Sequence, residues 1–223
     1  MFIGHYALGL AAKRAAPRTS LANLFIAPTL ADMLWPVFLL LGWEHAHVVP
    51  GPNPFLTLWL DDYPYSHSLL ALIVWAALFG AFYKRQTGDK RAAVVIALLV
   101  VSHWVLDVVT HRPDEPLYPG GSGLGLGLWN YPAATVIVET AMLFAGVVIY
   151  LRTTRARDGI GRWGFWGLLV LLAGSYYSTL FTPTPTNMTA LAVGGIIFGW
   201  VFVLLAWWVD RHREATTGPP APL

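Results

Sequence analysis

Long apolar runs alternate with short polar segments along the whole chain. A membrane-spanning helix needs about 20 mostly apolar residues, and six stretches approach that length. They are residues 21–42, 66–83, 92–110, 131–151, 163–181 and 188–209. The first contains Pro28 and Pro36, where we expect a kink. The apolar run 2–12 is too short to span a bilayer and predicts a half-helix packed against other helices.

These runs together predict an all-α fold, a polytopic helical bundle embedded in the membrane. We expect residues 1–214 to form one domain and residues 215–223, rich in Pro, to form a disordered tail. Composition agrees, because only 12% of the residues are charged, against about a quarter in a soluble domain. The chain has no Cys, so any metal must be held by His and carboxylate side chains.

The basic residues predict the orientation of the bundle. Thirteen of the fourteen Lys and Arg residues fall in segments that would lie on one side of the membrane, and only Arg112 falls on the other. The positive-inside rule places the thirteen, and the C-terminus, in the cytoplasm. We therefore expect no nucleic-acid partner. The opposite side carries two long loops, 43–65 and 111–130, and we expect the second, dense in Pro and Gly, to pack over the bundle.

Several ionisable residues lie where lipid would make them costly. Each costs about 2.5–3.5 kcal/mol on insertion scales and usually marks function. They are His5, Asp32, His67, His103, Asp107 and Glu139. At 1.5 Å per residue, all six lie about 12–25 Å above the cytoplasmic ends of their segments. A lone His in such a helix is more often a hydrogen-bond partner than a ligand, but agreement in depth indicates one site toward the outer leaflet.

The stretch SHWVLDVVTH places His103, Asp107 and His111 at steps of four. Residues four apart share one face of a helix. The two histidines are about 12 Å apart along the axis, too far to share one ion. Asp107 lies between them and can bridge two ions. The pattern predicts a two-metal site that activates water, with zinc first and manganese or iron next.

Two neighbours of this site are candidates for substrate binding. Ser66 precedes His67 at the start of a predicted span, where free N–H groups favour an anion. Arg112 follows His111 and suits a phosphate, although a simple surface role is about as plausible. We expect the loop carboxylates to be solvated or to edge the site. These are Glu44, Asp61, Asp62, Asp114 and Glu115.

Several motifs, in their order and spacing, resemble the bacterial family of predicted membrane-bound metal-dependent hydrolases. They are GHYALG, Asp32, YSHSLL, SHWVLDVVTHRPD and GLGLGLWN, within residues 1–140. The resemblance implies a location in the bacterial inner membrane. That family is distantly similar to the zinc-dependent phospholipase C and single-strand nuclease superfamily, whose zinc clusters hydrolyse phosphodiesters. This similarity implies six metal ligands: His5, Asp32, His67, His103, Asp107 and His111.

The chain departs from that superfamily at one position. A third metal there uses an H-x-x-x-E pair, but here Thr135 stands four residues before Glu139. We therefore expect two ions. The resulting hypothesis is a membrane hydrolase acting on a lipid-derived phosphoester, with Asp32 and Glu139 as catalytic residues. Two alternatives remain open: an ion- or proton-coupled transporter, and a membrane protein whose metal only braces the bundle. The substrate and the oligomeric state remain open.

Overall fold

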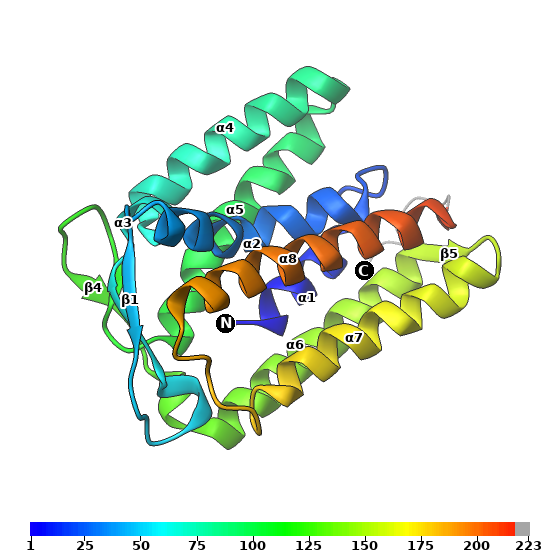
Figure 1. Ribbon diagram of the computed structural model, residues 1–223. Coiled ribbons are helices and arrows are strands. Elements are labelled where there is room, and N and C mark those ends of the chain that lie inside the picture. The colour runs from blue at the N-terminus through cyan, green and yellow to red at the C-terminus, as the bar shows by residue number, and fades with distance from the viewer. Residues whose placement is uncertain (217–223) are drawn as a thin grey trace.

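Helices dominate the computed structural model, which describes residues 1–216 (Figure 1). The helices are α1 (Ile3–Ala12), α2 (Leu21–Leu40), α3 (Pro64–His67), α4 (Leu69–Thr87), α5 (Lys90–Thr110), α6 (Pro132–Thr153), α7 (Phe165–Ser178) and α8 (Met188–Arg211). The strands are short and form three separate two-stranded antiparallel sheets. The predicted all-α membrane bundle is confirmed in its class.

Five helices are long and apolar enough to cross a membrane: α2, α4, α5, α6 and α8. Their outer faces carry exposed apolar side chains such as Leu98, Phe144 and Trp200, which suits contact with lipid. The fifth predicted span, residues 163–181, gives a helix that is shorter than its apolar pattern. Its first residues belong to a π-helical turn, η3 (Ile160–Gly164), and the α-helix that follows has 14 residues.

Polar residues in the sequence determine where the long helices begin. Four side chains cap helix N-termini by accepting a hydrogen bond from the backbone N–H three residues later. They are Ser20 for α2, Ser68 for α4, Asp89 for α5 and Asn187 for α8. The Ser68 cap separates α4 from the short helix α3. His67 therefore ends a helical turn of its own and does not open the membrane span.

Two glycines let α1 lie between α2 and α6. A Cβ atom on Gly9 would lie 2.4 Å from the carbonyl oxygen of Leu24 in α2. A Cβ atom on Gly146 in α6 would lie 2.5 Å from the carbonyl oxygen of Ala7. Pro28 lacks the N–H that would bond the Leu24 carbonyl, yet α2 continues through both of its prolines. This packing carries His5 into the interior.

The two long loops fold over one end of the bundle, as expected. The first contains β1 (His45–Val48), η1 (Pro54–Leu56) and β2 (Leu58–Asp62), with β1 and β2 antiparallel. The second contains β3 (Glu115–Pro116), β4 (Gly123–Leu124) and η2 (Leu128–Asn130). Figure 1 shows both loops on the left, beyond the ends of α2, α5 and α8.

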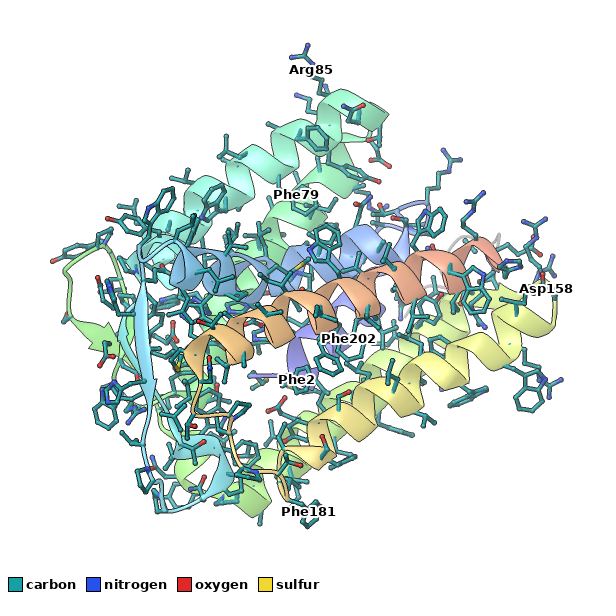
Figure 2. All side chains as sticks on the ribbon, in the orientation of Figure 1. Phe2, Phe79, Arg85, Asp158, Phe181 and Phe202 are labelled. Atoms are coloured by element: carbon teal, nitrogen blue, oxygen red, sulfur yellow. The ribbon has the colours of Figure 1, made fainter. Side chains whose placement is uncertain are left out.

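The opposite end carries the basic turns. Figure 2 shows Arg85 pointing away from the α4–α5 turn and Asp158 at the α6–α7 turn. A third two-stranded sheet pairs β5 (Thr154–Ala156) with β6 (Arg213–Ala215), and the Thr216 N–H donates to the Thr153 carbonyl. The predicted tail therefore begins later than residue 215, and residues 217–223 lie outside the described part. Which end faces the cytoplasm stays a prediction.

One buried ion pair ties the helices together at this basic end. Lys13 Nζ donates to both carboxylate oxygens of Asp210 in α8, at 2.8 and 2.7 Å. The same carboxylate accepts the Leu21 N–H at the start of α2 and the Tyr150 hydroxyl of α6, each at 3.0 Å. The pair therefore links the end of α1 to three other helices.

Candidate metal centre

Four helices bring their ionisable side chains to one place inside the bundle. His5 comes from α1, Asp32 from α2, His67 from α3, and His103 and Asp107 from α5. Three groups of donor atoms each lie within 4.8 Å of one another. They are His5/Asp32/His103, His67/His103/Asp107 and Asp107/His111/Glu115. All six metal ligands that the sequence predicted fall in these groups.

Asp107 occupies the centre of the cluster. Its Oδ2 lies 3.0 Å from His103 Nε2 and 3.9 Å from His111 Nε2. Its Oδ1 lies 3.0 Å from His5 Nε2 and also contacts the amino group of Met1. The steps of four residues therefore place Asp107 between two histidines, as the helical spacing predicted.

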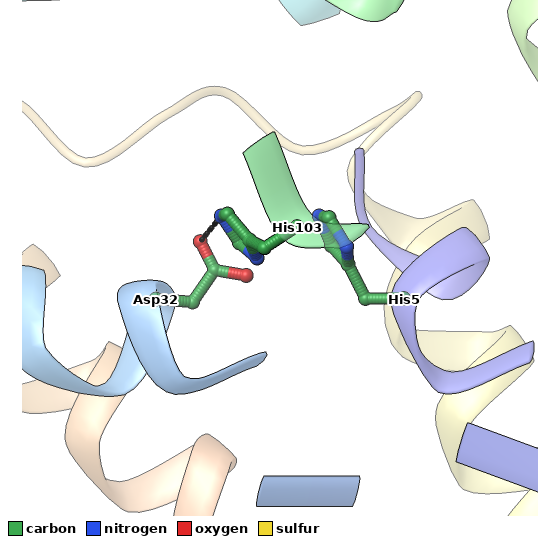
Figure 3. A group of neighbouring side chains, drawn as sticks. All are labelled: His5, Asp32 and His103. Carbon is green, nitrogen blue, oxygen red and sulfur yellow. Dashed lines mark ion pairs between the residues drawn. The ribbon is translucent and has the colours of Figure 1, made fainter. Parts of the chain in front are cut away.

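Asp32 lies at the edge of the cluster. Its Oδ1 is 3.7 Å from His67 Nε2 and 3.9 Å from His103 Nε2. Figure 3 shows Asp32 facing His103, with the His5 ring stacked on the far side of His103; the two ring centroids are 4.0 Å apart. The Asp32 side chain is 48% exposed, whereas that of His103 is fully buried. Asp32 is therefore the carboxylate that meets the space outside the cluster.

Three histidines share an orientation typical of metal ligands. The Nδ1 atoms of His103, His67 and His111 each contact an oxygen behind the ring. His103 Nδ1 donates to the Pro28 carbonyl at 2.8 Å, and His67 Nδ1 lies 2.7 Å from Ser66 Oγ. His111 Nδ1 lies 3.0 Å from a Glu115 oxygen. Metal-bound histidines have such a partner on the nitrogen that faces away from the ion, which leaves Nε2 for the metal.

The remaining Nε2 atoms converge on the two aspartates. His103 Nε2 is buried and lies 3.0 Å from Asp107 Oδ2, without a well-aligned hydrogen bond between them. A divalent cation between these two atoms would be bound by both of them. His5 differs from these three histidines, because its Nε2 also lies 3.0 Å from Asp107 but its Nδ1 has no hydrogen-bond partner among residues 1–216. The donor set therefore fits divalent metal ions held by imidazole and carboxylate.

Glu44 and Glu115 are both fully buried and not solvated. Glu115 instead edges the site beside Asp107 and His111, which was the other expectation for the loop carboxylates. Glu115 is the first residue of β3 and comes four residues after His111, whose Nδ1 it contacts. The short spacing between the two residues was therefore a signal of this contact in the sequence. Burial alone would lower the pKa of His111, but Glu115 and Asp114 outweigh it and raise that pKa to about 10. Glu44 lies 22 residues from its partner Ser66, and no local pattern indicated the contact.

The two predicted substrate-binding residues already have protein partners. The Ser66 N–H and hydroxyl both donate to Glu44, so a protein carboxylate occupies the helix start that was expected to receive an anion. Arg112 donates to Asp114 at 2.9 Å and to the Leu58 carbonyl at 3.0 Å. Its guanidinium also lies 3.8 Å from the centre of the Trp59 ring. Arg112 thus joins the two outer loops.

A cavity of about 280 Å³ lies beside the cluster. Polar residues of the cluster line one part of it, and aromatic side chains line much of the rest, among them Trp35, Phe55, Trp129 and Tyr176. The cavity therefore combines the polar residues of the cluster with apolar walls.

Glu139 lines the same cavity but is not in the groups of close donors. Its Oε2 accepts the backbone N–H groups of Phe2 at 2.8 Å and Gly4 at 3.1 Å. The side chain therefore holds the start of α1 in place. Phe2 itself packs against Phe202 of α8, with ring centroids 6.4 Å apart (Figure 2). A catalytic role for Glu139 stays a prediction.

Comparison with known families assigns the chain to a protein family. Residues 64–209 match the family model described as YdjM inner membrane protein. The chain belongs to the YdjM family of inner membrane proteins. The match includes His67, His103, Asp107 and His111 but begins after His5 and Asp32. No curated protein and no solved structure matches the chain. Together with the five apolar helices, the YdjM match confirms the predicted inner-membrane class.

Proposed function

We propose that this YdjM-family protein is a membrane-embedded, metal-dependent hydrolase that cleaves phosphoesters. The observation that carries the proposal is the convergence of three histidine Nε2 atoms on Asp107 and Asp32, each ring held from behind through Nδ1. A cluster built only to hold helices together would not need three imidazoles in one orientation. The chain resembles predicted membrane-bound metal-dependent hydrolases and, through them, zinc-dependent phospholipases C. This resemblance supports a phosphoester as the substrate.

The donor groups divide into two metal positions that share Asp107. His67 and His103 lie at one position, with Asp32 Oδ1 3.7 and 3.9 Å from their Nε2 atoms, and His111 lies at the other. We assign zinc first, with manganese or iron as alternatives, because the donors are imidazole and carboxylate without thiolate. Two such ions, when bound, polarise a phosphoryl oxygen and lower the pKa of water. Glu115 contacts Nδ1 of His111, so we assign it to orienting that ring.

The cavity supports an amphipathic substrate. Its aromatic walls suit an acyl or isoprenoid chain, and the phosphoester would then face the metal positions. Asp32 is half exposed beside the cavity, which suits a carboxylate that accepts a proton from water. A lipid-derived phosphoester has both the apolar chain and the polar group that this arrangement would bind.

Metal content tests the proposal directly. Detergent-purified protein should contain about two equivalents of zinc or manganese, and the pair of substitutions His103→Ala and Asp107→Ala should remove them. Metal-loaded protein should then release phosphate or a phosphorylated headgroup from a panel of lipid phosphoesters. A folded wild type that binds no added zinc, manganese or iron would refute the proposal. Metal-dependent ion flux in proteoliposomes without hydrolysis would favour the transporter instead.

A further inference from the structure

Glu44 is a fully buried carboxylate in the loop that follows α2. The metal positions proposed above do not use it, yet both of its oxygens are engaged. Oε1 accepts the backbone N–H groups of Tyr65 and Ser66, each at 2.8 Å. Oε2 accepts the Ser66 hydroxyl at 2.6 Å. A buried carboxylate costs several kcal/mol unless it is paired and hydrogen-bonded, so its three donors explain how it is tolerated.

The two backbone bonds fasten α3 to the end of α2. The N-cap residue of α3, Tyr63, caps the helix with no side-chain hydrogen bond in the described structure. Glu44 supplies the acceptor from a distant part of the chain, as an N-cap residue normally does locally. This link holds His67 of α3 against Asp32 of α2, with His67 Nε2 and Asp32 Oδ1 3.7 Å apart.

The Ser66 hydroxyl then determines which nitrogen of His67 carries its proton. A serine hydroxyl has one hydrogen and two acceptor lone pairs. Because Glu44 can only accept, Ser66 gives that hydrogen to Glu44. Ser66 Oγ can therefore only accept from His67 Nδ1, 2.7 Å away. The proton of neutral His67 is thus held on Nδ1, and the lone pair of Nε2 faces Asp32.

We propose that Glu44 and Ser66 are positioning residues that hold His67 in its metal-binding tautomer. The proposal rests on the metal centre proposed above. Glu44 acts through Ser66 and does not touch the metal or the substrate. The direction of the hydrogen bonds, from His67 to Ser66 to Glu44, is the feature that matters. Partners in this position typically change metal affinity by about 10–100-fold when they are removed.

Replacing Glu44 with Gln separates this role from simple packing. Gln has the same shape and can still accept the two backbone N–H groups through one oxygen. Its amide nitrogen would then face Ser66 and donate to it. Ser66 would in turn donate to His67 Nδ1, and the proton of His67 would move to Nε2, the nitrogen needed for the metal. Ser66→Ala removes the partner of Nδ1 without enforcing that wrong tautomer.

The experiment is a zinc titration of full-length protein in detergent, in competition with a chromogenic chelator. Ser66→Ala should weaken zinc binding by about 10-fold and Glu44→Gln by up to about 100-fold. The matched control is Glu214→Gln, which removes an exposed carboxylate paired with Arg155 in the β5–β6 sheet and should leave the affinity unchanged. Wild-type affinity in Ser66→Ala, or a smaller loss in Glu44→Gln than in Ser66→Ala, would overturn the proposal.

Two further measurements keep the result interpretable. Thermal unfolding of each metal-free variant shows whether it is folded, and Ser66→Ala alone decides the outcome if Glu44→Gln does not fold. The wild type separates the two proposals. If it binds no metal, the metal centre itself is wrong. If it binds metal and both variants match it, the metal centre stands and only the role of Glu44 and Ser66 is refuted.

Discussion

Replacing Asp107 with Asn tests whether one carboxylate serves two metal ions. The substitution keeps the size of the side chain but removes its charge and one acceptor oxygen. In the structure Asp107 Oδ1 lies 3.0 Å from His5 Nε2. Asp107 Oδ2 lies 3.0 Å from His103 Nε2 and 3.9 Å from His111 Nε2. Asp107 belongs to two of the three groups of close donors. We therefore expect Asp107→Asn to lose both ions.

Asp32→Asn is the informative comparison. Asp32 belongs to only one of the three groups, and it lies on the His67 and His103 side of the cluster. This variant should lose one ion and keep about one, out of the two expected for a two-metal site. Asp61→Asn is the matched control, because Asp61 is an exposed carboxylate paired with His47 on the outer hairpin. It should keep the full metal content.

The assay is metal per chain by mass spectrometry, combined with hydrolysis of a lipid phosphoester. Loss of a preorganised electrostatic group typically costs about 100–1,000-fold in rate, and Asp107→Asn should lose at least that much. Circular dichroism and gel filtration confirm that each variant is folded. The reasoning is refuted if folded Asp107→Asn keeps two ions, or if Asp32→Asn loses both while Asp107→Asn loses one.

Three further predictions concern the helices and the second metal position. Lys13→Met leaves the buried carboxylate of Asp210 without its cation. A denaturing-detergent titration should show that the free energy of unfolding falls by about 3–5 kcal/mol. A loss below about 1 kcal/mol would contradict this. Gly9→Ala, whose Cβ would lie 2.4 Å from an α2 carbonyl, should displace α1 and reduce bound zinc, whereas Gly174→Ala, with open space around it, should not. Because the pKa of metal-free His111 is raised to about 10, this ring is protonated at pH 7 and zinc must displace that proton. Zinc affinity should therefore rise by up to about tenfold per pH unit between pH 7 and 9, and an affinity independent of pH would exclude His111 as a ligand.

Local patterns predicted most of the helices and the central part of the site. Apolar runs indicated α2, α4, α5, α6 and α8 because a bilayer demands continuous hydrophobic length. The stripe of His103, Asp107 and His111 followed from helical geometry alone, since residues four apart share a face. The length of the fifth predicted span, 163–181, was overestimated, because an apolar run does not show where its helix changes to a π-helical turn or ends.

Only the tertiary structure decided how the site is supported and where it opens. Whether Asp32 is buried or exposed depends on the cavity beside α2, which forms where outer loops and several helices meet. Glu44 and Glu115 looked like ordinary loop carboxylates, and their burial comes from contacts that the folded chain makes. The Glu44–Ser66 contact joins residues 22 positions apart. The sequence by itself determined which side chains cannot remain in lipid without partners, because that cost belongs to each residue. Which partner each one meets depends on how the helices and loops pack, since those contacts exist only in three dimensions.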